Sequence, residues 1–411
     1  MPKISTQIKK NTFWLVTFQL AKMVFPFLVL PILTHRLSVE VYGNLTFVKT
    51  IMNFLQILVD FGFMLSATKD IAKAKPDLSK INQILTHTFT ARLLLGLLGF
   101  LITLLLCSFM PLLNANLLFT FLSYLAVFLS IFLFDFLFRG LEIIHIITIR
   151  FILMKALSTL CTILFVHHDH QILLIPLLDI LSSIIAILLV IHEVSKLHLK
   201  FIRPKLKSIL FSLKTSFIYF LSDISSTTFN ALSTLVIGLV FSSTEVALFG
   251  LSIQIIGAIQ ALLGQLSGGI YPDMIRQKSL QLLKNIFRQT LPLVIILTFS
   301  IAIFSSFGLK MLGGDKYLTA TPIIQILSLT IPFSYCSIIL GWPTLGVINQ
   351  QSAVTFSTIT ATLFNLASLL ILLWLGQLSL ISVALVRLCT ELVLFSIRFY
   401  LFYQHRSKFN P

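Results

Sequence analysis

The sequence alternates long apolar runs with short polar gaps, and this pattern sets the expected fold. Each run is about as long as the 20 residues that cross a hydrocarbon core of about 30 Å as a helix. The runs are continuous, which favours helices over the alternating strands of a membrane barrel. The pattern therefore predicts an all-α polytopic membrane protein with about twelve transmembrane helices. The predicted spans are 12–34, 44–66, 84–108, 117–138, 147–166, 171–192, 215–240, 247–271, 290–310, 323–345, 352–375 and 380–402.

Lysine and arginine fall mainly into every second gap between these spans. The loops on one side carry only Arg36 and Lys316, whereas most of the loops on the other side and both chain ends are basic. Short cytoplasmic loops collect Lys and Arg, so we expect the N- and C-termini to be cytoplasmic. The longest polar gap, 193–214, is interpreted as a basic cytoplasmic linker. It separates an N-terminal six-helix lobe (1–192) from a C-terminal six-helix lobe (215–411).

A short internal repeat supports two similar lobes. The segment 38–41 (Ser-Val-Glu-Val) follows the first span, and 243–246 (Ser-Thr-Glu-Val) follows the seventh. Two six-span repeats are one of the known plans of secondary transporters, with the substrate site between the halves near the middle of the bilayer. The repeat therefore favours a transporter.

Composition narrows the classes of function. The chain is 57% hydrophobic and 11% charged, with a net charge of +16. Soluble domains carry about 25% charged residues, so no separate soluble domain is expected. The basic residues flank the membrane, which favours anionic membrane lipids over nucleic acid as partners. The polar loops show no catalytic group or nucleotide motif, and the four cysteines lie in apolar runs. The loop 167–170 (His-His-Asp-His) has metal-ligand residue types, but a four-residue turn cannot close a tetrahedral site alone. We therefore expect neither an enzyme nor a metal protein.

Three basic residues lie well inside the predicted spans. They are Lys22, Arg92 and Lys155, and each such charge costs roughly 2.5–3.5 kcal/mol at the centre of a spanning helix. We predict that these residues, with Gln19 near Lys22, line a hydrated cationic cavity that binds an anionic group of the substrate. The alternative is that the charges pair with acidic residues or reach the lipid headgroups.

Other basic and acidic residues of the spans have simpler interpretations. Lys49, Asp135 and Arg398 lie near predicted span ends, where long or polar side chains reach the headgroups. Arg387 and Glu391 are four residues apart and share a helix face, so we expect them to pair.

A polar run in the seventh span, 222–230, holds serines, threonines, Asp223 and Asn230. It is too polar for lipid contact, so we predict that Asp223 and Asn230 line the cavity of the C-terminal lobe. Asp60, near the inner end of the second span, and Asp223 are also the candidates for binding a coupling proton or sodium ion.

Short membrane motifs are concentrated in the first 142 residues. They are Asn11-Thr12-Phe13-Trp14-Leu15, Gln19, Pro26 to Pro31, Tyr42-Gly43, Asp60-Phe61-Gly62-Phe63, Ser66 to Ala72 and Phe138-Arg139-Gly140-Leu141-Glu142. Together they resemble the Wzx O-antigen and polysaccharide flippases, as does Tyr271-Pro272. Arg139 stands where that family usually has glutamine.

The resemblance implies a fold, a substrate and partners. The fold is that of the multidrug/oligosaccharidyl-lipid/polysaccharide exporter (MOP, MATE-like) superfamily: two six-helix lobes around a central cavity. The substrate is an oligosaccharide repeat unit of O-antigen or capsule on undecaprenyl diphosphate, moved from the cytoplasmic to the periplasmic leaflet of the bacterial inner membrane. A polysaccharide polymerase and a chain-length regulator are the implied protein partners, and no cofactor is expected. A MATE-like small-molecule antiporter and a membrane polysaccharide polymerase are the alternatives.

Overall fold

The computed structural model describes residues 6–409, and these residues form helices and no strand. In this part of the chain, eleven helical segments are long and apolar enough to cross a membrane. The all-α membrane fold is therefore confirmed, whereas the count of twelve stays a prediction. The remaining predicted span, the seventh at 215–240, is helical but belongs to α10 (Leu206–Val240), which is not among the eleven. Its polar run 222–230 accounts for the difference.

The chain divides into two compact units within α10. Unit 1 ends at Ile224 and unit 2 begins at Ser225. The connection before α10 is shorter than the predicted linker 193–214, because α9 (Leu174–Lys196) extends into it and α10 already begins at Leu206.

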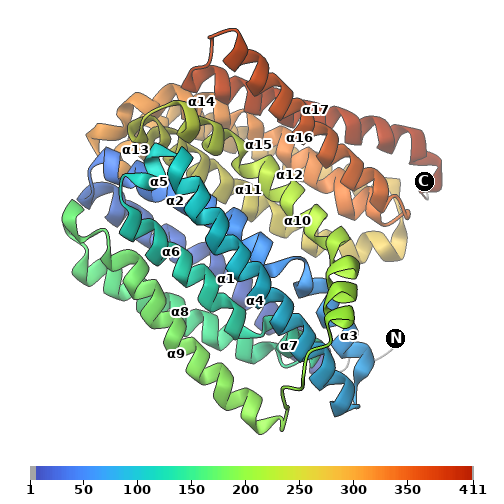
Figure 1. Cartoon of the computed structure of the whole chain (residues 1–411). Coiled ribbons are helices and arrows are strands. Elements are labelled where there is room, and N and C mark those ends of the chain that lie inside the picture. The colour runs from blue at the N-terminus through green and yellow to red at the C-terminus, as the bar shows by residue number, and fades with distance from the viewer. Residues whose placement is uncertain (1–5, 410–411) are drawn as a thin grey trace. The chain divides into compact units, whose positions relative to one another are not determined.

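Unit 1 places long helices side by side (Figure 1). Helix α8 packs against both α1 and α9, and α2 packs against α4 and α6. These contacts bring together helices that carry charges in their interiors. The helices of unit 1 before α9 are α1 (Thr6–Arg36), α2 (Val39–Asp60), α3 (Phe63–Ala74), α4 (Leu78–Phe109), α5 (Pro111–Asn114), α6 (Leu117–Leu129), α7 (Asp135–Gly140) and α8 (Ile144–Phe165), with a 3-10 turn at Ser130–Leu133 and another at Asp169–Gln171.

The repeated sequence segment begins a helix in both units. In unit 1, Ser38 caps α2 by accepting a hydrogen bond from the backbone N–H of Val41, and its own N–H donates to Asp169 at 2.8 Å. In unit 2, Ser242 and Glu245 form a capping box at the start of α11. A hydroxyl and a carboxylate at this place satisfy N–H groups that have no partner within the helix. When segments 38–41 and 243–246 are aligned, the capping serine of unit 2, Ser242, lies one residue before the position that matches Ser38.

A sharp bend and a tight helix contact explain several of the motif residues. Phe61 and Gly62 have φ angles of 41° and 72°, and this left-handed pair separates α2 from α3. A Cβ at Gly62 would lie 2.7 Å from the backbone nitrogen of Phe220, so a glycine is required on two grounds. A Cβ at Gly140 would likewise lie 2.7 Å from the side chain of Ile71. Because glycine has no Cβ, α7 can approach α3 closely at this residue. These motifs shape the packing of unit 1.

The segment between α9 and α10 is attached to α4. The backbone N–H of Lys200 donates to Asn82 Oδ1 at 2.9 Å, and that of Ile202 donates to Thr86 Oγ1 at 3.1 Å. Side-chain acceptors on α4 thus replace the helical hydrogen bonds that this segment lacks.

Unit 2 is organised around its last long helix. Helix α17 packs against α14, α15 and α16, and α11 packs against α14 and α15. The polar residues of α17 are thereby surrounded by other helices. The elements of unit 2 after α10 are α11 (Ser243–Gln277), α12 (Leu280–Ile303), α13 (Ser305–Gly313), a 3-10 segment (Asp315–Ala320), α14 (Thr321–Ser328), α15 (Thr330–Ile339), a π-helical segment (Leu340–Gly346), α16 (Gln351–Trp374), α17 (Leu380–His405) and a 3-10 turn (Arg406–Lys408).

Candidate functional site

Arg92 is paired with Asp60 inside unit 1. Arg92, on α4, donates from Nη2 to Asp60 Oδ1 on α2 at 2.6 Å. Gln56 donates from Nε2 to the other oxygen of Asp60 at 2.9 Å and to Ser130 Oγ at 3.0 Å. The group lies at a small cavity of about 60 Å³. The pairing alternative considered for Arg92 is therefore the one observed, and Asp60 is already bound to a cation.

Two further ion pairs connect helices of unit 1. Arg150 of α8 donates to Asp135 at 2.6 Å, so the expectation that Asp135 reaches the headgroups is wrong. Sequence reasoning missed Arg150 because it lay at the edge of a predicted span. Lys155 Nζ lies 3.3 Å from Asp179 Oδ1, which also accepts a hydrogen bond from Ser158 at 2.7 Å. Lys155 thus also has a carboxylate partner, but this pair is only half-buried.

Lys22 and Gln19 lie on α1 with exposed side chains. The ammonium of Lys22 lies 5.4 Å from the ring centroid of Phe18 on the same helix, within cation–π range. Within residues 6–409, no hydrogen bond or ion pair joins Lys22 or Gln19 to Arg92 or Lys155. Their role in substrate binding stays a prediction.

Asp223 and Asn230 lie on the same helix but in different units. Asp223 is exposed at the unit 1 end of α10, within electrostatic reach of Asp60. Asn230 belongs to unit 2, where its Oδ1 accepts a hydrogen bond from Arg387 at 3.4 Å and its Nδ2 donates to the Ser226 carbonyl.

A cavity of about 450 Å³ lies within unit 2. Its wall is built from α10, α11, α14, α15, α16 and α17. The volume is within the range of roughly 300–1,000 Å³ that small-molecule sites occupy. The polar residues of its lining are Ser226, Asn230, Gln260, Thr330, Ser334, Ser337, Thr358, Arg387, Glu391 and Arg398.

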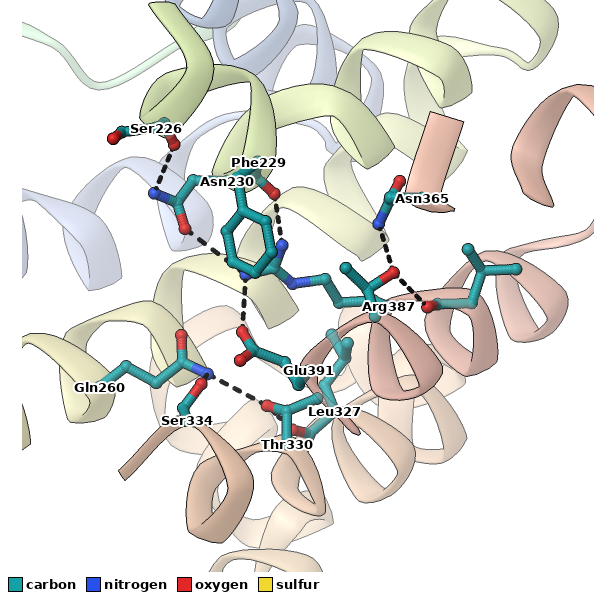
Figure 2. Close-up of polar contacts among 12 residues, drawn as sticks. Ser226, Phe229, Asn230, Gln260, Leu327, Thr330, Ser334, Asn365, Arg387 and Glu391 are labelled. Atoms are coloured by element: carbon teal, nitrogen blue, oxygen red, sulfur yellow. Dashed lines mark hydrogen bonds and ion pairs between the residues drawn. The ribbon is translucent and has the colours of Figure 1, made fainter. Parts of the chain in front are cut away.

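One side of this cavity is a network around Arg387 (Figure 2). Arg387 pairs with Glu391 one helical turn away at 3.0 Å, which confirms the expected pair. Its guanidinium also donates to the carbonyl of Phe229 and lies 4.3 Å from the centroid of that ring. Arg387 is thereby held by one full charge, by carbonyl and amide oxygens and by an aromatic face.

A second group of polar side chains comes from α11 and α15. Gln260 Nε2 donates to Ser334 Oγ at 2.8 Å and to Thr330 Oγ1 at 3.1 Å, as Figure 2 shows. The hydroxyl of Ser337, one turn further along α15, is buried and has no hydrogen-bond partner among the described residues. Sequence reasoning missed these residues, since isolated Ser, Thr and Gln give little signal within an apolar run.

Arg398 also lines the cavity, and the expectation that it reaches the headgroups is wrong. Its side chain is buried, and it donates to Ser357 Oγ at 3.0 Å, to the Ser337 carbonyl at 2.7 Å and to Thr358 Oγ1 at 3.0 Å. A spacing signal was present in the sequence. Arg398 follows Arg387 by eleven residues, which is about three helical turns, so both lie on one face of α17.

The fold defines a class of membrane protein. A MATE-family multidrug resistance transporter of the MOP superfamily, solved in an inward-facing conformation, matches with a TM-score of 0.71 and 12% identity, over 96% of this chain and 98% of that one. The lipid II flippase MurJ, in an inward closed conformation, matches with a TM-score of 0.72 and 13% identity, over 96% and 87%. The chain therefore has the MATE-like fold of multi-pass membrane proteins, and at these identities the likeness extends to the fold alone.

The sequence comparison then gives the family. The profile of the family described as "Polysaccharide biosynthesis protein" matches residues 8–278, so the chain belongs to that family. Proteins described as "Putative O-antigen transporter" are 26% identical over 269 residues in Shigella dysenteriae and 25% identical over 285 residues in Escherichia coli K12. These alignments cover 65% and 64% of this chain and 67% and 64% of the relatives. The resemblance noted from the motifs is confirmed.

Proposed function

We propose that this protein is a flippase for a lipid-linked oligosaccharide. It moves an O-antigen or capsule repeat unit on undecaprenyl diphosphate from the cytoplasmic to the periplasmic leaflet of the bacterial inner membrane. The observation that carries the proposal is the family match over residues 8–278, and the two relatives described as O-antigen transporters support it. The MATE-like fold is the kind of scaffold that works by alternating access.

The chemistry of the described residues is compatible with such a substrate. A diphosphate leaves water only where cationic or N–H donors replace its hydration, and guanidinium groups do this best. Oligosaccharides need hydroxyl and amide partners, and unit 2 supplies a cavity lined by several of both. The polyprenyl chain is as apolar as the bilayer and can stay in it.

Ion coupling forms a second part of the proposal. Asp60 is already paired with Arg92, whereas Asp223 is exposed and interacts electrostatically with the negative charge of Asp60. We therefore place the coupling proton or sodium ion at Asp223. In this scheme the protein performs no covalent chemistry, and a polymerase and a chain-length regulator act on the delivered units.

Deletion of the gene in its native bacterium tests the function. We expect lipid-linked repeat units to accumulate in the cytoplasmic leaflet and surface polysaccharide to disappear, with recovery when the gene is supplied again. Accumulation of single units on the periplasmic side would instead indicate a polymerase. Normal polysaccharide combined with increased sensitivity to toxic small molecules would indicate a multidrug antiporter.

A further inference from the structure

The cavity of unit 2 carries one positive charge that no carboxylate pairs with. Among the described residues, the buried arginines are Arg92, Arg150, Arg387 and Arg398. The first three each form an ion pair with an aspartate or glutamate. Arg398 has no carboxylate within ion-pair distance in the described part of the chain. A buried charge without a counter-ion is unfavourable, so its presence requires a reason.

The hydrogen bonds of Arg398 leave its charge available. A guanidinium has five N–H donors. Three of those on Arg398 are used, and the acceptors are two hydroxyls and one backbone carbonyl, all neutral. These contacts fix the orientation of the side chain without neutralising it. Two donors remain for another partner.

The cavity lining contains a single carboxylate, and it forms an ion pair with only one of the two arginines in the lining. Glu391 lies within electrostatic reach of Arg398, but its ion pair is with Arg387, at 3.0 Å. Two arginines against one glutamate leave one net positive charge in the lining. The Arg387 end is already neutral, so the surplus charge is located at Arg398.

We propose that the unit 2 cavity binds a compact oxyanion through Arg398. The anion is a phosphate of the lipid carrier or a carboxylate of an acidic sugar, and both form paired N–H···O bonds with a guanidinium. The choice between these sources rests on the proposed function, whereas the anion site itself does not.

The surroundings of Arg398 fit this class of ligand. The cavity volume of about 450 Å³ exceeds that needed for a phosphate or a sugar acid. The hydroxyl of Ser337 is buried and without a described partner, and Ser337 lines the same cavity as Arg398. Ser334 lines the same cavity, and because its oxygen accepts a hydrogen bond from Gln260, its own O–H is left to donate. An anion would thus meet one charge and the hydroxyls of Ser334 and Ser337.

Direct binding to the purified full-length protein in lipid nanodiscs tests the site. The probes are inorganic diphosphate and glucuronate, with glucose as the uncharged reference, measured by calorimetry. We expect binding of at least one anion, weakened about 10- to 100-fold in Arg398→Gln, because a hydrogen bond to a charged group is lost. Arg398→Lys keeps the charge but not the fork, and should bind with intermediate affinity. Arg276→Gln removes the same charge from an exposed position and should bind as the wild type does.

The results separate the possible sources. Binding of diphosphate alone supports the lipid headgroup, and binding of glucuronate alone supports an acidic sugar. Absence of binding by the wild-type protein overturns the proposal, as does equal binding by wild type and Arg398→Gln.

A second measurement does not depend on an Arg398 variant. In a protein whose native cysteines are replaced by alanine, Thr358→Cys, at a partly exposed position of the cavity lining beside Arg398, is labelled with a small thiol reagent. The anion that binds should slow this labelling at least fivefold, whereas glucose should not. Unchanged labelling in the presence of saturating anion would overturn the location of the site.

The outcome is distinguishable from that of the proposed function. If deletion blocks export but Arg398→Gln binds anions normally, the anion site is wrong and the flippase stands. If binding depends on Arg398 but deletion leaves the lipid-linked units correctly distributed, the site stands and the flippase is wrong.

Discussion

The charges of the buried arginines are neutralised to different extents in the two units. In unit 1, Arg92 and Arg150 each meet an aspartate of another helix at 2.6 Å. In unit 2, Arg387 meets Glu391 at 3.0 Å, whereas Arg398 meets only neutral oxygens. The same residue type therefore occurs both as half of a neutral pair and as a charge held ready inside the protein.

This difference distinguishes arginines that hold two helices together through a carboxylate from an arginine whose charge is free to bind a ligand. A guanidinium bonded to a carboxylate on a neighbouring helix joins the two helices, and its field is largely cancelled. Arg92 and Arg150 join α4 to α2 and α8 to α7 in this way. An ionisable residue within a membrane that lacks such a partner is by default a candidate for function. Arg398 meets that description better than Arg92, which was the stronger candidate from the sequence.

Glu391→Gln should have the largest effect. The change removes the carboxylate in the lining, leaving Arg387 and Arg398 without a negative partner there. Breaking a buried ion pair by removing one member costs about 3–5 kcal/mol. We expect a marked fall in the temperature at which the purified protein in detergent loses its monodisperse form. Glu193→Gln removes a more exposed carboxylate and should leave that temperature unchanged. A Glu391→Gln variant as stable as the wild type would contradict the claim that this carboxylate neutralises a buried arginine in unit 2.

Arg92→Gln should lose more stability than Arg398→Gln, whereas Arg398→Gln should lose more transport. Loss of Arg92 leaves Asp60 without its cation and should cost about 2–3 kcal/mol. Loss of Arg398 leaves only neutral acceptors and should cost about 1 kcal/mol. Surface polysaccharide per molecule of folded protein should nevertheless fall much further in Arg398→Gln. The paired measurement is thermal stability in detergent and polysaccharide in the deletion strain. Equal losses in both assays would remove the distinction between the units.

Long-range partners explain what the sequence could not predict. The spans and the Arg387–Glu391 pair follow from local rules, since apolar length and a four-residue spacing are visible in the chain. The pairing of Arg92 with Asp60 joins residues 32 positions apart on two helices. Its geometry depends on how α4 packs against α2, which local patterns do not determine.

Arg398 shows how a boundary estimate misleads. The predicted span ended at 402, which placed Arg398 near the headgroups. In the structure α17 continues to His405, and Arg398 lies among α15 and α16 residues such as Ser337 and Ser357. The eleven-residue spacing from Arg387 was the stronger signal, because it follows from helix geometry and not from where the helix ends.

A double-mutant cycle on Asp60 and Arg92 should give the next largest effect. Asp60→Asn and Arg92→Gln each leave a charge unpaired, whereas the double variant leaves neither. Contacting residues couple by about 0.5–3 kcal/mol, and we expect the upper half of that range here. The same cycle on Arg398 and Ser357 should give a smaller coupling, since Ser357 is neutral. Stability in detergent is the readout. Additive losses for Asp60 and Arg92 would contradict the ion pair as a source of stability.

Lys155→Gln should have the smallest effect. The exposed fractions of the Lys155 and Asp179 side chains are 37% and 29%, and half-exposed pairs contribute less than about 1 kcal/mol. Asp179 would also keep the hydrogen bond from Ser158 and the nearby charge of Lys49. We therefore expect thermal stability and surface polysaccharide close to the wild type, and the same for the exposed control Lys214→Gln. If Lys155→Gln alone abolished polysaccharide at a normal protein level, the available charge would lie in unit 1, and Arg398 would be the structural one.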